Sequence, residues 1–353
     1  TMENLPVEVI GNILSFIGSA RDVVVASATC KKWREAWCNH LHNLSFDCCD
    51  WPLFDDFTSA RLEIIITETI FQTKALQSLT IFLDDEQKFS AAPVIAWLMH
   101  TRDSLRQFRY NVRTTPCFNI IEKCSRQRLE VLTLTDNSIT GVDPSYWKFP
   151  CLKSLSLSFL SISALDLTLL LSACPKLETL AMVNLVIAMS DASLELRSVS
   201  LKVFDLELFT SNKFILEADL LEKLHLMDCS FEVFKLIGKG TLKVLKFDDV
   251  KLIDLDIGDS TENLEIIDVC NFTTTWPKFY HMISKASKLY KLRLWGVVFD
   301  DEDEVVDIKT ISVWFRQLTH LSLRYDLRDG VLHYDLRGLS CLRNVVVLEL
   351  GWT

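Results

Sequence analysis

Cysteine and histidine are the residue types here with the widest chemical range, because they ligate metals, act as nucleophiles and transfer protons. The chain has 11 cysteines and 7 histidines in 353 residues. Cys48 and Cys49 are adjacent, Cys117 and Cys124 lie seven apart, and the sequence contains no Cys-x-x-Cys pair and no paired histidines. We therefore expect no bound metal, and we expect reduced thiols packed as small hydrophobic groups.

The motifs of common catalytic sites are absent from the sequence. It has no Gly-x-Ser-x-Gly elbow, no phosphate-binding glycine loop, no His-Glu-x-x-His and no dinucleotide fingerprint. We therefore expect a protein without catalytic residues and without a cofactor.

The C-terminal part of this acidic protein carries a local basic and aromatic cluster. Its members are Lys291, Arg293, Trp295, His320 and Arg324. Guanidinium groups bind carboxylates and phosphates well, so a protein partner with acidic or phosphorylated side chains suits this surface. The alternative is a solvated charged surface on which the cations pair with Asp268 and Glu349.

A run of five acidic residues, Asp300–Glu304, is the strongest concentration of negative charge in the sequence. A calcium loop interrupts its carboxylates and needs a glycine for its turn, and this run does neither. We expect a solvated loop tip. Because acidic side chains repel phosphates, we do not expect an inositol phosphate or a hormone pocket there.

Composition narrows the class of partner. Lys and Arg number 37 against 47 Asp and Glu, a formal net charge of −10. Affinity for nucleic acid or an anionic membrane depends on clustered cations, so neither is an expected partner. No apolar run approaches the ~18–20 residues of a spanning helix, and the N-terminus lacks a secretion signal. We expect a soluble protein of the cytoplasm, the nucleus or both.

The elements that position these residues follow from an internal repeat. The pattern apolar-x-x-apolar-x-apolar recurs with spacings of 20–29 residues. Its registers begin at Leu76, Leu105, Leu129, Leu152, Leu177, Leu201, Leu221, Leu242, Leu264, Leu289, Leu318 and Val345, and Leu41 begins an earlier candidate. Two apolar positions two apart face the same side of a strand, so neighbouring units must stack into a parallel sheet to bury them.

Between these strands the sequence predicts helices in the longer repeats. Helical spacing of apolar residues occurs in Pro93–Met99, Leu165–Ala173, Phe279–Lys285 and Ile308–Phe315. Between Leu201 and Leu264 the spacing falls to 20–22 residues, and extended segments replace helices. We expect two helix-bearing parts on either side of a thinner middle.

Residues 4–40 lack the repeat and predict three short helices. Leu5-Pro6 opens the first helix, Glu8 lies in its first turn, and Gly18 ends it. Its apolar residues form a broad stripe of Val9, Ile10, Ile13, Leu14 and Ile17. A module of this size has more apolar surface than its own core can use, which indicates docking.

Two resemblances follow from these patterns. The order Leu5-Pro6-x-Glu8-Val9-Ile10-x-x-Ile13-Leu14-x-x-Ile17, followed by Cys30-Lys31-Lys32-Trp33, resembles the F-box. The loop Gly18–Asp22 departs from it, because it lacks the usual proline and is about one residue longer. The repeats over residues 41–353 resemble the leucine-rich repeat family. The implied fold is α/β: a three-helix F-box over residues 2–46, then a leucine-rich-repeat solenoid over residues 47–353 with about 12 repeats.

The resemblance implies a division of labour. An F-box binds a Skp-type adaptor, which links it to a cullin–RING ubiquitin ligase, while the repeats bind a protein substrate. Carried over by position, the adaptor-binding residues are Leu5, Pro6, Ile10, Ile13, Leu14, Ile17 and Trp33. The basic and aromatic cluster is then the candidate substrate-binding surface, and the subunit itself is not an enzyme.

Two other functions stay open at this point. In the first, the chain is an intracellular leucine-rich-repeat scaffold or inhibitor whose N-terminal helices only cap the solenoid. In the second, it binds the adaptor without delivering a substrate for degradation. The chain also ends directly after a strand-like segment, Val345–Leu350, so we expect that a C-terminal cap is missing.

Overall fold

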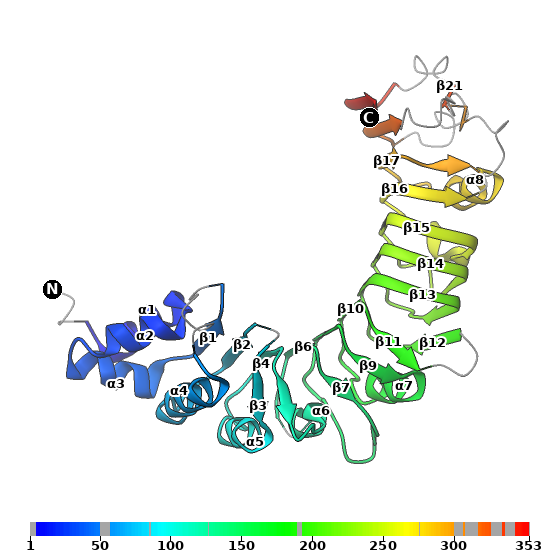
Figure 1. Cartoon of the computed structure of the whole chain (residues 1–353). Helices are drawn as coiled ribbons and strands as arrows, with labels where there is room; N and C mark the ends of the chain where they lie inside the picture. Colours follow the sequence, from blue (N-terminus) through cyan, green and yellow to red (C-terminus); the bar gives the residue numbers. More distant parts are fainter. Residues whose placement is uncertain are drawn as a thin grey trace. The chain divides into compact units, whose positions relative to one another are not determined.

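The computed structural model describes residues 5–49, 57–84, 86–125, 127–188, 193–274, 276–299, 306–307, 317–325, 334–335 and 343–352 (Figure 1). The expected helix Ile308–Phe315 and the acidic run Asp300–Glu304 lie outside these residues. The chain divides into two compact units, residues 1–176 with 185–187, and residues 177–184 with 188–353.

The N-terminal module consists of the three expected helices. These are α1 (Val7–Ile17), α2 (Ala20–Ser27) and α3 (Lys31–His40). Pro6 precedes α1, where its missing N–H is harmless, and Glu8 lies in the first turn near the positive end of the helix dipole. Gly18 adopts φ 74° and ends the helix, a conformation that glycine takes with little strain.

A parallel sheet forms the centre of the first unit. Its strands are β1 (Asn43–Asp47), β2 (Ser78–Phe82), β4 (Gln107–Tyr110), β6 (Val131–Thr135) and β8 (Ser154–Ser158), in chain order. Their residues alternate between buried and partly exposed, as a sheet covered on one face requires. Leu44 of β1 pairs with Leu79 of β2. The first strand of the sheet therefore begins within residues 2–46, which we expected to form the F-box.

Helices lie along one side of this sheet (Figure 1). They are α4 (Ser59–Gln72), α5 (Ala91–His100), α6 (Ile120–Cys124) and α7 (Ala164–Ser172). The expected helices Pro93–Met99 and Leu165–Ala173 are confirmed as α5 and α7, whereas α4 and α6 were not predicted. Short second strands follow the turns: β3 (Lys88–Ser90), β5 (Arg113–Thr115), β7 (Ser138–Ile139), β9 (Ser161–Ser163) and β11 (Val186–Ala188).

The second unit continues the repeat pattern with further parallel strands of the same sheet. Its main strands are β10 (Thr179–Val183), β13 (Val203–Glu217), β14 (Lys223–Ile237), β15 (Val244–Asp256), β16 (Ile266–Thr274), β17 (Lys291–Trp295), β20 (His320–Tyr325) and β22 (Val347–Trp352). Additional elements are β12 (Ser193–Arg197), the 3₁₀ helix η3 (Gly258–Thr261), α8 (Trp276–Ser284), β18 (Val298–Phe299), β19 (Val306–Asp307) and β21 (Tyr334–Asp335). All twelve predicted registers carry a strand.

The thinner middle is also confirmed. Strands β13 and β14 run for 15 residues each and β15 for 13, so extended chain replaces the helix of the longer repeats. The core between these long strands is filled by phenylalanine side chains that pack against one another. The rings of Phe214 and Phe234 are parallel with centroids 5.4 Å apart, and Phe231 meets both edge-on.

One backbone conformation recurs two residues after the third apolar residue of the repeat pattern, either at the end of a strand or inside one of the long strands β13 to β16. Positive φ values occur at Asp136, Phe159, Asn184, Leu208, Asp228, Asp249, Asn271 and Gly296. Asn, Asp and Gly tolerate this left-handed conformation, which bends the chain out of the strand. Phe159 and Leu208 do not fit that preference, and both side chains are about half exposed.

Candidate functional site

The two faces of α1 have different roles. Ile10 and Leu14 are fully buried, and Gly11 lies so close to α3 that a Cβ there would be 2.3 Å from the Cβ of His40. Ile10 and Leu14, which we expected on the adaptor surface, therefore belong to the core of the module. The broad apolar stripe of α1 thus spans two faces of the helix, and Ile10 and Leu14 lie on the inner one.

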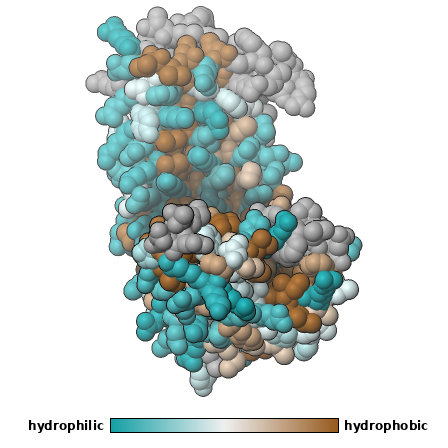
Figure 2. Space-filling model, turned by 90° about the vertical axis from the view of Figure 1, so that its left-hand side faces the viewer, coloured by the Kyte–Doolittle hydropathy of each residue, from teal (hydrophilic) through white to brown (hydrophobic). Residues whose placement is uncertain are grey.

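The opposite face of α1 is apolar and open. Val9, Ile13, Phe16 and Ile17 follow the i, i+4, i+7, i+8 spacing of one helix face. Phe16 is 92% exposed, Val9 is 40% exposed and Ile17 is 39% exposed, while Ile13 is half-buried. We call these four residues the α1 outer face. Figure 2 looks onto the N-terminal end and shows hydrophobic residues gathered in patches among hydrophilic ones.

Phe16 and Val9 were absent from the predicted site residues. The helical spacing of Phe16 from Val9 and Ile13 was the signal that could have identified both. Of the other predicted residues, Leu5 and Trp33 are half-buried and Pro6 is exposed. The structure therefore leaves five of the seven predicted adaptor residues accessible.

The first unit has a second apolar surface. Val24 and Val25 of α2, with Phe46 of β1 and Ile65 of α4, line a hollow of about 160 Å³. Val25 is largely exposed. Since α2 and α4 both belong to the first unit, the apolar surface of the module extends onto the start of the repeats.

The module is also fixed to the first strand of the sheet. The N–H of Ser45 donates to the Gly18 carbonyl at 2.9 Å, and the N–H of His42 donates to the hydroxyl of Ser15 at 3.0 Å. The helices thus cover the end of the sheet with one side and leave the α1 outer face uncovered.

The predicted substrate residues lie on neighbouring strands of the second unit. Lys291 of β17 pairs in register with His320 of β20, and both side chains are exposed. Trp295 pairs with Arg324 in the same ladder. The side chain of Arg324 lies outside the part of the chain that the structure describes in detail.

Arg293 is not a free cation. Its Nε donates to Asp268 Oδ1, and its guanidinium carbon lies 4.5 Å from the centre of the Trp295 ring. The pairing with Asp268 that the sequence left open is therefore present. Glu349 does not pair with a cation among the described contacts; it accepts a hydrogen bond of 2.7 Å from Ser322.

These contacts form a connected row across four strands. The Trp295 indole donates to Ser322 Oγ at 2.8 Å, which links the Arg293 pair to Glu349. Further along the same row, His225 Nδ1 lies 3.5 Å from Asp205 Oδ1. Acidic and basic side chains thus both occur along this row of the second unit.

A polar hollow was not predicted from the sequence. It lies in the first unit, is open to solvent, and its residues come from β3, β5 and the turns beside β7 and β9. Lys88 and Arg113 supply positive charge, and Arg113 is 3.3 Å from Asp136. The ring of Phe159 supplies its apolar wall.

The cysteines behave as packed hydrophobic groups where they are buried. Burial raises the pKa of Cys174 to about 12 and the pKa of Cys229 to about 11, because a low-dielectric core disfavours the thiolate. Among the described residues, one group of three potential metal ligands lies within 4.8 Å, Asp47 with Cys48 and Cys49. The Asp47 carboxylate already accepts a hydrogen bond of 2.8 Å from the Cys49 N–H.

Comparisons with known proteins agree with both halves of the chain. A family model described as F-box-like matches residues 2–44. A model described as the LRR repeats of FBD-associated F-box protein At5g56370 matches residues 100–261. None of the helices in the described ranges is long and apolar enough to cross a membrane.

Two curated relatives come from Arabidopsis thaliana. The chain is 62% identical to the F-box/LRR-repeat protein At1g67190 over 354 residues, which cover 100% of this chain and 84% of that protein. It is 26% identical to the F-box protein At1g10780 over 192 residues, 51% of this chain and 43% of that protein. With an N-terminal F-box module, a parallel repeat sheet and this full-length similarity, the chain belongs to the F-box/LRR-repeat family.

Proposed function

We propose that this chain is the substrate-recognition subunit of a Skp–cullin–F-box ubiquitin ligase. The F-box binds a Skp-type adaptor and through it the cullin–RING ligase, and the repeat surface binds a protein substrate. The subunit performs no catalytic step. It acts by raising the concentration of the substrate near the site of ubiquitin transfer, in the cytoplasm or the nucleus.

The observation that carries this proposal is the exposure of the α1 outer face. An aromatic side chain as exposed as Phe16, flanked by three aliphatic residues, is costly to leave in water and is typical of an interface centre. A helix that only capped the sheet would need one apolar face. This helix has two, and the inner one already covers the module core.

Co-purification with a Skp-type adaptor tests the proposal. We expect Phe16→Asp and Ile13→Asp each to weaken adaptor binding at least tenfold, about 1.4 kcal/mol, while thermal unfolding stays within a few degrees of the parent. Leu165→Asp is the matched control, because Leu165 is an exposed apolar residue on α7, far along the chain from the module. Unchanged binding by both F-box variants would support the scaffold reading instead.

The substrate surface is part of the same proposal. Lys291 and His320 are the accessible members, while Arg293, Trp295 and Arg324 complete the cluster. Because Asp268 compensates Arg293, we expect Lys291 and His320 to contribute most to an acidic partner. Affinity capture of the parent chain while degradation is blocked should recover both the ligase subunits and the substrate. Capture with the Phe16→Asp variant should recover the substrate without the ligase subunits, and the comparison therefore identifies the substrate.

A further inference from the structure

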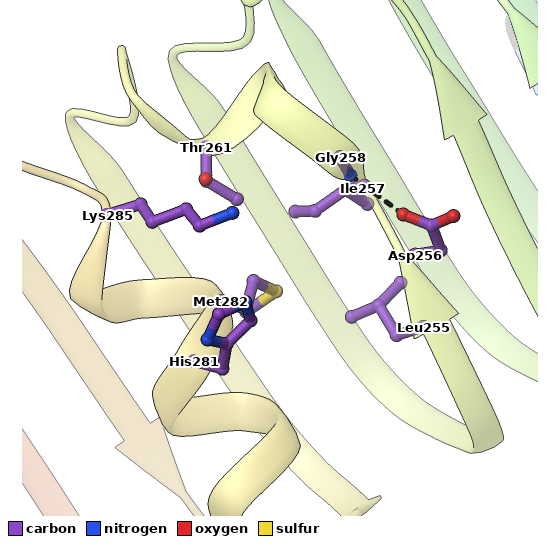
Figure 3. A pocket seen from close by; sticks show the side chains of 8 residues that line it. All are labelled: Leu255, Asp256, Ile257, Gly258, Thr261, His281, Met282 and Lys285. Carbon is purple, nitrogen blue, oxygen red and sulfur yellow. Dashed lines mark hydrogen bonds between the residues drawn. The ribbon is translucent and has the colours of Figure 1, made fainter.

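A hollow in the second unit lies between η3 and α8 (Figure 3). Its volume is about 120 Å³, and it is partly open to solvent. Ile257 and Met282 form its apolar walls, and Thr261, His281, Lys285 and Asp256 supply its polar groups. None of these residues belongs to the adaptor or substrate surfaces described above.

Thr261 is the unusual member of this hollow. The residue is 1% exposed, and its Oγ1 has no hydrogen-bond partner among the described residues. A buried hydroxyl without a partner is unfavourable, and such groups in folded proteins usually contact an ordered water, an ion or a ligand. The position therefore needs an occupant that accepts or donates a hydrogen bond.

The charges around the hollow indicate which occupant fits. His281 lies on α8 and Lys285 directly follows the end of that helix; both are exposed and line the same space as Thr261 (Figure 3). Among the described contacts, Lys285 has no acidic partner.

The one carboxylate of the hollow is already compensated. Asp256 lies 3.0 Å from Lys235 Nζ and accepts a hydrogen bond of 3.0 Å from the Gly258 N–H. The hollow thus offers a hydroxyl donor, an ammonium group and an imidazole, with its negative charge balanced from outside.

We propose that this hollow is a binding site for a phosphate group. The hydroxyl of Thr261 and the ammonium group of Lys285 would donate to the phosphate oxygens, and the imidazole of His281 would add a third donor from the rim. Charge-assisted hydrogen bonds of this kind favour an oxyanion over a neutral molecule. The phosphate comes either from inorganic phosphate or from a phosphorylated protein side chain.

Titration calorimetry on the full chain tests this site, with inorganic phosphate as the probe at constant ionic strength. We expect saturable binding, and we expect Thr261→Val and Lys285→Ala each to weaken it at least tenfold. Lys288→Ala is the matched control, because Lys288 is also exposed but contacts Asn263 at 2.6 Å outside the hollow. The proposal is overturned if Thr261→Val and Lys285→Ala bind phosphate like the parent.

Thermal unfolding distinguishes the site from a hollow that holds only water. Valine matches threonine in shape and removes the unpartnered hydroxyl, so Thr261→Val should raise the unfolding temperature in chloride. In phosphate the parent should gain stability by ligand binding and Thr261→Val should not. An equal effect of phosphate on both proteins would contradict the proposal, since phosphate also stabilises proteins without binding.

A short phosphoserine peptide, Ala-phosphoserine-Ala with blocked ends, distinguishes the two sources. Tenfold tighter binding of the peptide than of inorganic phosphate assigns the site to a phosphorylated protein, and the reverse assigns it to the free ion. Comparable affinities mean that the site accepts both. Failure of both probes to bind overturns the proposal.

Discussion

The indole N–H of Trp37 donates a hydrogen bond of 3.0 Å to the hydroxyl of Thr73, and both residues are buried. Trp37 lies on α3 of the F-box, and Thr73 directly follows α4 of the first repeat. The Thr73 hydroxyl donates in turn to the Thr69 carbonyl at 2.9 Å. The F-box is therefore joined to the repeats by a buried polar contact within one core.

This contact predicts opposite behaviour for two tryptophans of the same helix. Trp37→Ala should lower the free energy of unfolding by about 3–5 kcal/mol, because it empties a core position and leaves Thr73 without its donor. Trp33→Ala should change that free energy by less than about 1 kcal/mol, since Trp33 is only half-buried, but should weaken adaptor binding. Urea unfolding and adaptor pull-down measure the two effects, and equal loss of stability in both variants would refute the assignment.

The two faces of α1 should also separate in experiment. Leu14→Ala should destabilise the protein by about 2–5 kcal/mol, because Leu14 is fully buried in the module. Phe16→Ala should leave stability within about 0.5 kcal/mol and lower adaptor affinity. Circular dichroism melts check the first result. A Phe16→Ala variant that bound the adaptor normally would remove Phe16 from the interface.

Replacing the strained turn residues should stabilise the repeats. Phe159→Asn and Leu208→Asn should each raise the free energy of unfolding by roughly 1 kcal/mol, because asparagine tolerates the left-handed conformation better than either residue. Asp136→Ala, at a position with the same conformation, should lower it. Denaturant midpoints give the comparison. If Phe159→Asn were instead destabilising, the packing of the exposed ring would outweigh the backbone strain.

Thiol labelling at pH 8 should follow burial. Cys49 and Cys117 are exposed and should react with iodoacetamide, whereas Cys174 and Cys229 should stay unmodified in the native protein. Burial raises the pKa of Cys229 from 9.0 to about 11 in the folded protein. Between about pH 9 and pH 11 the thiol therefore loses its proton in the unfolded chain but keeps it in the folded one, so the free energy of unfolding falls over this range. Peptide mass spectrometry identifies the labelled sites, and early labelling of Cys174 would contradict its burial.

The basic and aromatic cluster of the second unit predicts an effect on the substrate. Lys291→Glu should weaken capture of an acidic substrate at least tenfold, because Lys291 is exposed and has no acidic partner among the described contacts. Lys176→Glu is the control, an exposed lysine outside the cluster. Adaptor binding should be unchanged in both. Equal capture by the parent and Lys291→Glu would exclude this part of the surface.

Substrate lifetime tests whether the captured protein is degraded. In cells that lack this chain, a substrate of the ligase should persist several-fold longer after protein synthesis is blocked, and the parent chain should restore its turnover. The Phe16→Asp variant should not restore it. An unchanged lifetime would favour the non-degradative alternative.

The sequence predicted the fold well where local spacing determines the structure. The strand registers and α1 to α3 follow from short apolar periods that need no knowledge of distant contacts. Helix α4 was missed although Leu62, Ile66 and Ile70 recur every four residues and Thr58 caps its start. This helix lies between the repeat registers at Leu41 and Leu76, so the strand pattern does not include its apolar residues.

The candidate sites were predicted less completely, for a physical reason. Periodicity shows that α1 is apolar over a broad arc, but it does not show that Ile10 is buried in the module and that Val9 is exposed. The Arg293–Asp268 pair follows from strand register, so it could be anticipated as an alternative. The hollow at Thr261 depends on how η3 meets α8, and no spacing in the sequence encodes that meeting.

Gly11 is a position at which α1 lies very close to α3, and a substitution there has a consequence for the whole F-box. Its lack of a side chain lets α1 lie against His40, so a single added methyl group would push the two helices apart. Under the proposed function, a cell that expresses Gly11→Ala alongside the normal protein would contain a chain that still binds its substrates but does not bind the adaptor. Gly11→Ala would then act as a dominant-negative variant. The substrates would accumulate in complex with it, and they could be identified in that complex.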